Sequence, residues 1–255
     1  MSFIIVIPAR YDSSRLPGKP LRDLAGKPLL QHVYECATRS DADAVIIATD
    51  DERIEKTANQ FGARVCMTGS HHTSGTERIA EVITSMGITD DTTVVNLQGD
   101  EPMMPAACLN QVARLLKENP DCPMAILCEP ISKEKDIFDP NVVKVVIDHQ
   151  GHALYFSRAP VPWNRATFSD TKEDSPVPQG GYFRHIGLYA YRAGYVKQYL
   201  AAPISPIEKL EALEQLRVLW NGERIAIGEA VASTGPGVDT EDDLKQVESL
   251  MSVSS

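Results

Sequence analysis

The segment Phe3-Ile-Ile-Val-Ile-Pro-Ala-Arg-Tyr-Asp-Ser-Ser-Arg-Leu-Pro-Gly-Lys-Pro-Leu21 joins an apolar run to a long basic connection. Residues 3–8 form a short, continuous apolar stretch, which is typical of a buried strand. Residues 28–39, which follow the connection, carry apolar side chains at helical spacing. A strand, a connection and a helix in this order predict the first β-α unit of a parallel sheet.

The same alternation continues along the first half of the chain. We expect further strands at 45–49, 64–67 and 93–97, and helices at 50–61, 77–86 and 106–117. The rhythm changes after about residue 123, where we expect strands at 124–128, 142–148, 153–157, 185–191 and 225–230, a long loop at 160–181, and helices at 206–220 and 241–251. We therefore predict one α/β domain, 1–255, with a mostly parallel sheet, helices on both faces and an inserted lobe in the second half.

The composition restricts the class of protein. The net charge of −10 over 255 residues argues against general nucleic-acid binding, because that binding needs a basic field. No stretch approaches the ~20 apolar residues of a membrane span. The five cysteines are scattered and lack zinc or redox spacing, so we expect reduced thiols and a cytoplasmic protein.

The connection after the first strand is a candidate phosphate-binding loop. It contains five basic residues against two acidic ones (Arg10, Arg15, Lys19, Arg22 and Lys27 against Asp12 and Asp23). It leaves the carboxyl end of a strand, where open α/β sheets bind ligands. It matches neither G-x-G-x-x-G nor G-x-x-x-x-G-K-[ST], which excludes a dinucleotide fold and a P-loop. The alternative is a solvated basic loop without a ligand.

Two further segments offer carboxylates. The strand at 93–97 is followed by Asp100 and Glu101, and Asp239 precedes the last helix. Mg²⁺ in proteins is typically held by one or two carboxylates together with water and substrate phosphates. The alternatives are an acidic turn at Asp100 and a helix N-cap at Asp239, and the sequence alone does not show that these two side chains meet. His71-His72 is a poor metal pair because no third ligand is spaced nearby.

Taken together, these segments resemble the 3-deoxy-manno-octulosonate cytidylyltransferases (CMP-Kdo synthetases) over nearly the whole chain. The resemblance rests on ordered motifs: Ile7-Pro-Ala-Arg-Tyr-x-Ser-x-Arg-Leu-Pro-Gly-Lys-Pro-Leu21, Ser74-Gly-Thr-Glu-Arg78, Asn96-x-Gln-Gly-Asp-Glu-Pro102, Asn141-x-Val-Lys-Val, Ala153-Leu-Tyr-Phe-Ser-Arg158, Arg184-His-Ile-Gly-x-Tyr189, Leu213-Glu-Gln-Leu-Arg217 and Gly237-Val-Asp-Thr240. The first motif alone would indicate only the wider group of sugar nucleotidyltransferases.

The resemblance implies a Rossmann-like nucleotidyltransferase fold, and a homodimer formed through the inserted lobe at roughly 130–225. It implies Mg²⁺-dependent transfer of CMP from CTP to the anomeric hydroxyl of Kdo, with release of pyrophosphate, which activates Kdo for lipopolysaccharide biosynthesis. By resemblance, the cytidine and triphosphate lie among Pro8, Ala9, Arg10, Arg15, Lys19, Ser74, Gly75, Arg78 and Gln98. Asp100 and Asp239 hold Mg²⁺ and, with Arg10 and Lys19, form the catalytic set. The sugar acid lies among Gln98, Arg158, His185, Tyr189, Glu214 and Gln215.

Three alternatives to this function stay open. In the first, the enzyme transfers CMP to a related sugar acid, such as 8-amino-Kdo or sialic acid. In the second, the chain is a metal-dependent glycosyltransferase of similar fold. The third alternative is a non-catalytic nucleotide-sugar sensor, which would be expected to lose a metal carboxylate or the phosphate lysine. Asp100, Asp239 and Lys19 are all present. Glu214 and Gln215 also have a neutral interpretation, as the partly exposed polar face of a helix.

Overall fold

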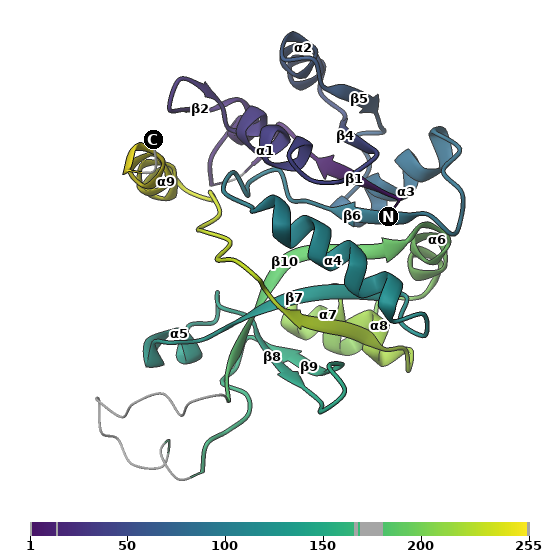
Figure 1. Ribbon diagram of the computed structural model, residues 1–255, viewed down its shortest axis with the longest axis vertical. Coiled ribbons are helices and arrows are strands. Elements are labelled where there is room, and N and C mark those ends of the chain that lie inside the picture. Colours follow the sequence, from purple (N-terminus) through teal and green to yellow (C-terminus); the bar gives the residue numbers. More distant parts are fainter. Residues whose placement is uncertain (1, 14, 166–167, 169–180, 254–255) are drawn as a thin grey trace.

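The computed structural model describes residues 2–13, 15–165, 168 and 181–253 and contains a nine-stranded mixed sheet (Figure 1). Seven strands lie in the order β11 (Ile225–Glu229), β7 (Met124–Pro130), β10 (Phe183–Arg192), β6 (Thr93–Asn96), β1 (Phe3–Pro8), β4 (Ala44–Thr49) and β5 (Arg64–Met67). Strand β10 runs antiparallel to both of its neighbours, and the other pairs along this path are parallel. The predicted mostly parallel α/β fold is confirmed.

Helices cover both faces of the sheet. One face packs against α1 (Leu29–Thr38), α2 (Glu52–Gln60) and α4 (Ala106–Glu118). The other packs against α3 (Gly75–Ser85), α6 (Ala193–Ala201) and α8 (Leu216–Trp220). In β1, Phe3, Ile5 and Ile7 enter the first core and Val6 the second, as the two-residue period of a strand requires. Because β1 is buried on both faces, its sequence is a continuous apolar run rather than an alternating one.

Strand β1 lies where the connections of the sheet change direction. The chain passes from β1 outward to β4 and β5, and then returns to β6 on the other side of β1. In open α/β sheets, the ends of two strands at such a reversal leave a crevice that binds ligands. The basic connection after β1 and the Gln98–Asp100 segment after β6 both leave the sheet at this crevice. The fold therefore brings together two of the segments that the sequence marked as candidates.

The final helix closes onto the basic connection. Helix α9 (Glu241–Val253) buries Leu244 and Val247 against Leu16, Leu24 and Leu29. Leu16 belongs to the basic connection, and Leu24 belongs to a small hairpin that follows the short 3-10 helix η1 (Lys19–Leu21) and consists of β2 (Asp23–Leu24) and β3 (Lys27–Pro28). This apolar contact fixes the start of α9 near the ends of β1 and β6.

One predicted helix is wrong. Residues 206–220 form two helices, α7 (Pro206–Glu211) and α8, because Ala212 adopts the left-handed conformation with φ 50°. The apolar side chains expected on one buried face are divided: Leu213 is buried, but Leu210 is 84% exposed. Glu208, expected outside, is buried and pairs with Arg217, which compensates its charge.

The second half is not a separate unit. Strand β10 lies inside the main sheet, and the hairpin of β8 (Lys144–Ile147) and β9 (Ala153–Ser157) extends the sheet from β10. The short helix α5 (Glu134–Phe138), which follows β7 in the chain, lies at the lower left of the molecule (Figure 1). Most of the predicted loop at 160–181 lies outside the described residues. The use of this region for dimerisation stays a prediction.

Among the helices that the structure describes, none combines the length and the apolar character that crossing a bilayer requires.

Candidate active site

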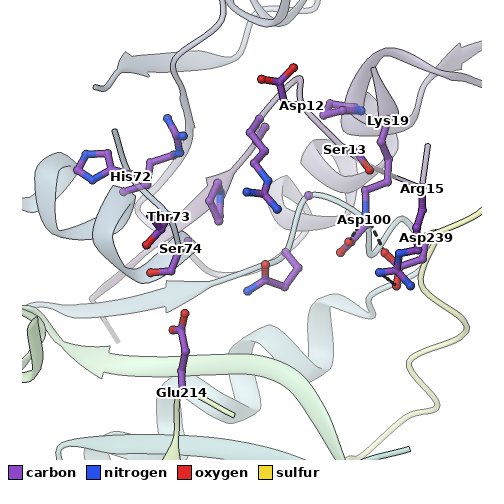
Figure 2. Close-up of a pocket in the computed structure, with 18 residues that line it drawn as sticks. Asp12, Ser13, Arg15, Lys19, His72, Thr73, Ser74, Asp100, Glu214 and Asp239 are labelled. Atoms are coloured by element: carbon purple, nitrogen blue, oxygen red, sulfur yellow. Dashed lines mark hydrogen bonds and ion pairs between the residues drawn. The ribbon is translucent and has the colours of Figure 1, made fainter. Parts of the chain in front are cut away.

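A cavity of about 400 Å³ lies at the crevice beside the end of β1 (Figure 2). Three segments meet there at close range. A Cβ atom on Gly99 would lie 2.9 Å from the Pro8 carbonyl oxygen, and one on Gly75 would lie 3.2 Å from the Pro8 ring. Glycine at these two positions lets the segments after β6 and before α3 approach the end of β1. We call this space the large cavity.

The basic connection is folded back on itself beside the large cavity. The Gly18 N–H donates to the Tyr11 carbonyl at 3.2 Å, and Gly18 has φ +66°. The Tyr11 ring lies between Gly18 and the Arg53 guanidinium of α2, which sits 3.3 Å from the ring centroid. This turn directs Lys19, the residue after Gly18, toward the end of β6.

Asp100 and Asp239 meet on one ammonium group. Lys19 Nζ donates to Asp100 Oδ2 at 2.6 Å and to Asp239 Oδ1 at 3.0 Å, and an Arg15 guanidinium nitrogen lies 3.0 Å from Asp239 Oδ2 (Figure 2). The turn before α9 is held in place by the Val238 N–H, which donates to the Asp100 carbonyl at 2.8 Å. Burial alone would lower the pKa of Lys19, but the two carboxylates raise it above its usual value.

The five cations of the connection have separate roles. Arg10, Arg15 and Lys19 line the large cavity. Arg22 instead forms an ion pair with Glu241 of α9, and Lys27 pairs with Glu35 of α1. The positive charge that the sequence assigned to the whole connection is therefore concentrated on three side chains.

Glu101 differs from its neighbour Asp100. Its side chain is absent from the lining of the large cavity, and Gly237 packs against its carboxyl group. Burial, together with the negative charge of Asp100, raises the pKa of Glu101 to about 8. Glu101 is therefore a mostly neutral acid at pH 7, and it is not among the carboxyl groups that line the large cavity.

The residues that the resemblance assigned to the nucleotide surround the large cavity: Pro8, Ala9, Arg10, Arg15, Lys19, Ser74, Gly75, Arg78 and Gln98 all line it. Ser74 caps α3 by accepting from the Glu77 N–H. Arg78 is 3% exposed and is held by Thr68 and Asp50, which fixes its guanidinium. Figure 2 shows Ser74 on the opposite side of the cavity from Lys19, Asp100 and Asp239.

A small cavity of about 210 Å³ adjoins the large one, and Gly75, Gln98 and Glu214 line both. Tyr189 and Gln215 line the small cavity, as do Thr76, Asn96 and Tyr191. The Gln215 side-chain nitrogen is buried and has no hydrogen-bond partner among the described residues. An unpaired buried amide is costly, so this nitrogen indicates a polar ligand in the small cavity.

The remaining two predicted sugar-acid residues lie outside the linings of both cavities. His185 packs against Phe156 and Tyr189, and burial lowers its pKa to about 4, so its imidazole is neutral at pH 7. Arg158 donates to the backbone carbonyls of Glu211 and Pro140. Arg158 therefore lies near the α7–α8 turn, and His185 lies near Tyr189. The role of both residues in binding a sugar acid stays a prediction.

Several lining residues of the large cavity were missed by the sequence analysis: Asp12, Ser13, Pro20, His72, Thr73 and Gly99. Most of these residues lie inside or beside the quoted motifs. Their closeness in the sequence to predicted site residues could have identified them as lining residues. His72 was considered only as half of a metal pair. It pairs with Glu81 of α3 and stacks on His71 instead.

A mostly parallel sheet with a basic connection and two converging carboxylates at its switch point is typical of an enzyme that binds a phosphorylated ligand. Comparisons with known proteins identify its family. Residues 4–225 match the cytidylyltransferase family. The chain is 55% identical over 250 residues to the 3-deoxy-manno-octulosonate cytidylyltransferase of Idiomarina loihiensis, covering 98% of each chain. It is 52% identical to the enzyme of the same name from Coxiella burnetii over 247 residues, or 97% of this chain and 98% of the other.

The solved structure of a CMP:2-keto-3-deoxy-manno-octonic acid synthetase complexed with CTP is similar over 100% of both chains, with a TM-score of 0.90 and 41% identity. The chain belongs to the 3-deoxy-manno-octulosonate cytidylyltransferase family of nucleotidyltransferases. The family that the motifs indicated is thereby confirmed.

Proposed function

We propose that this protein catalyses Mg²⁺-dependent transfer of CMP from CTP to the anomeric hydroxyl of Kdo, with release of pyrophosphate. The observation that carries the proposal is the convergence of Asp100 and Asp239 on Lys19 Nζ at the edge of the large cavity. The names of the relatives support Kdo as the acceptor, and the CTP-bound relative supports CTP as the donor. The product would serve lipopolysaccharide biosynthesis in the cytoplasm.

The donor set fits a magnesium ion. Two carboxylates already lie within 3.0 Å of one cationic nitrogen, so a single cation can contact both. Within the described residues, no group of three or more His, Cys, Asp or Glu side chains is arranged as a metal site. Mg²⁺ commonly takes only one or two carboxylates and completes its shell with substrate phosphates and water. When bound to Asp100 and Asp239, the ion would supply charge neutralisation at the phosphates and a lowered pKa for the attacking hydroxyl.

The protein's own cations orient the triphosphate. Arg15 and Lys19 lie on the carboxylate side of the large cavity, and Arg10 also lines it. Once the nucleotide is bound, we expect these three side chains to pair with phosphate oxygens and to offset the charge that develops on pyrophosphate. In-line displacement then needs positioning rather than a covalent nucleophile, so no CMP-protein intermediate is expected.

The opposite side of the large cavity suits the nucleoside. Ser74, Gly75 and Arg78 lie at the start of α3 and line the cavity. Figure 2 shows Ser74 across the cavity from Lys19. The small cavity continues from Gln98 and Glu214 toward Tyr189 and adds amide and carboxylate groups. Such groups match the several hydroxyls of a sugar acid.

The test is a pyrophosphate-release assay over four nucleoside triphosphates and a panel of sugar acids that includes Kdo, 8-amino-Kdo and sialic acid, with and without Mg²⁺. We expect release only with CTP, Kdo and the metal. Preference for another sugar acid would refute the acceptor, and release in EDTA would refute the metal requirement. CTP binding without turnover of any acceptor would support a sensor instead.

We also propose a homodimer that uses the second half of the chain. Exposed apolar side chains support it: Leu154 of β9, Leu210 of α7 and Trp220 of α8 are 60%, 84% and 55% exposed. Helix α8 contacts both α7 and β9, so the three exposed side chains lie on neighbouring elements. Exposed apolar side chains that lie near one another are typical of a protein interface. Leu210→Glu should weaken the dimer at least tenfold in analytical ultracentrifugation, whereas Val231→Glu, equally apolar and 60% exposed but beyond the lobe, should not. A wild-type monomer would contradict this proposal.

A further inference from the structure

Two side chains distant in the sequence meet where the large and small cavities adjoin. Thr76, in the first turn of α3, donates through Oγ1 to Glu214 Oε2 at 2.7 Å. Thr76 is 3% exposed, and Glu214 lies in the turn between α7 and α8. Glu214 lines both cavities, whereas Thr76 lines only the small one. Thr76 is not among the residues expected to contact the nucleotide or the acceptor.

The proton of the Thr76 hydroxyl has a defined direction. Thr76 Oγ1 lies 2.7 Å from Glu214 Oε2. A threonine hydroxyl has one proton to donate, and a carboxylate only accepts. The single Thr76 proton is therefore directed to Glu214. The carboxylate is therefore held by a buried, ordered donor.

The position of Glu214 indicates which substrate its carboxylate contacts. Figure 2 shows it on the far side of the large cavity from Lys19, Asp100 and Asp239. A carboxylate accepts hydrogen bonds from hydroxyls and repels phosphates. The small cavity, which Glu214 borders, is also lined by Gln215, whose buried side-chain nitrogen has no hydrogen-bond partner in the part of the chain that the structure describes. These groups together favour a neutral, hydroxyl-rich part of a ligand.

We infer that Thr76 is a positioning residue that aims the Glu214 carboxylate at a hydroxyl of the acceptor. This inference rests on the proposed function and adds a specificity element to it. Thr76 directly follows Gly75 in the first turn of α3. Gly75 lines the large cavity, where the nucleotide is expected, and Thr76 contacts Glu214, so one helical turn serves both ligands. Acceptor affinity should therefore depend on Thr76, although Thr76 is not assigned a contact with the acceptor.

The test compares Thr76→Val with Thr76→Ser by steady-state kinetics with CTP and the sugar acid. Valine keeps the shape but removes the hydroxyl, and we expect the acceptor KM to rise on the order of tenfold to a hundredfold, the range of one hydrogen bond to a charged group. The CTP KM should stay within about threefold, since one lost acceptor contact leaves nucleotide contacts intact. Serine restores the donor and should restore the acceptor KM.

A double-mutant cycle distinguishes positioning from a general structural effect. In a Glu214→Gln background, Thr76→Val should add little further increase in the acceptor KM, because the carboxylate it positions is already absent. Calorimetric CTP binding checks that the variants keep a folded nucleotide site. If Thr76→Val does not fold, Thr76→Ala, which also removes the hydroxyl donor to Glu214, should raise the acceptor KM more than the CTP KM.

Two results would overturn the inference: an acceptor KM unchanged in Thr76→Val, or a CTP KM that rises as much as the acceptor KM. The second result would assign Glu214 to the ribose of the nucleotide. Failure of the proposed function is separate, because wild-type enzyme would then not release pyrophosphate with CTP and Kdo. If the wild type uses another sugar acid, the same variants are compared with that acceptor, and the same two outcomes decide.

Discussion

Replacing Lys19 with methionine should separate triphosphate handling from nucleoside binding. Lys19→Met keeps most of the apolar stem and removes the ammonium that contacts Asp100 at 2.6 Å and Asp239 at 3.0 Å. The Lys19 side chain is only 16% exposed, so its charge is screened less than that of a surface pair. A preorganised donor at a developing charge contributes about 3 kcal/mol.

That free energy corresponds to a loss of roughly a hundredfold in kcat/KM for CTP. CMP lacks the β- and γ-phosphates, so its inhibition constant should change by no more than about threefold. The assays are pyrophosphate release with varied CTP, and competition by CMP. Equal losses for CTP and CMP would refute the assignment of Lys19 to the triphosphate.

Arg22→Met is the matched control for Lys19→Met. Arg22 lies in the same connection and carries the same charge, but its guanidinium pairs with Glu241 and does not line the large cavity. Exposed ion pairs contribute about 0–1 kcal/mol. Arg22→Met should therefore leave kcat/KM within about threefold of wild type. A large loss in this variant would indicate that net charge, rather than position, determines phosphate binding.

Three further predictions follow from the geometry of the site. Asp100→Asn or Asp239→Asn should lower kcat at least a hundredfold at saturating Mg²⁺ while CMP still binds, and activity within tenfold of wild type would contradict the metal assignment. Gly18→Ala should raise the CTP KM more than Gly62→Ala, because both have positive φ but only a Gly18 Cβ would meet the Tyr11 ring, at 3.1 Å. Because the pKa of His185 falls to about 4 on folding, the unfolded chain binds more protons between pH 4 and 6.5. The unfolding free energy of the wild type, measured by urea titration, should then fall by about 2 kcal/mol from pH 6.5 to 4.5. The unfolding free energy of His185→Phe should fall by less over the same range. An equal dependence on pH in the two proteins would contradict this prediction.

Local patterns predicted most of the α/β framework. The apolar run at residues 3–8 forms β1 as expected, and the helix expected at 50–61 forms as α2, whose N-cap is Asp51. The prediction that the connection binds phosphates is unchanged, but the number of its cations that line the large cavity is three rather than five. Its charge count could not show that Arg22 and Lys27 pair with α9 and α1, because those partners are set by tertiary packing.

The break at Ala212 shows where local patterns fail. Residues 206–220 contain leucines at helical spacing and no glycine or internal proline. The helix nevertheless ends because long-range contacts hold both sides of Ala212. The Glu211 carboxylate accepts from Ser157 and Arg158, and Glu214 accepts from Thr76. These contacts turn Glu214 and Gln215 toward the cavities, a placement that a continuous helix would not have given.

The meeting of Asp100 and Asp239 also depends on the tertiary structure. The two residues are far apart in the sequence, and each has an ordinary local interpretation as a turn or cap residue. The Val238–Asp100 backbone hydrogen bond and the docking of α9 on Leu16 and Leu24 bring them to Lys19. Sequence motifs indicated both carboxylates by resemblance, but their convergence required the fold.

The proposed reaction cleaves CTP at the α-phosphorus and transfers CMP to a sugar acid. Phosphorus NMR of wild-type enzyme with CTP, Kdo and Mg²⁺ detects both products at once. We expect one new phosphodiester signal for each pyrophosphate formed by the wild type, and neither signal with the Asp100→Asn variant. Formation of CDP and inorganic phosphate, or of CMP without a sugar phosphodiester, would contradict it.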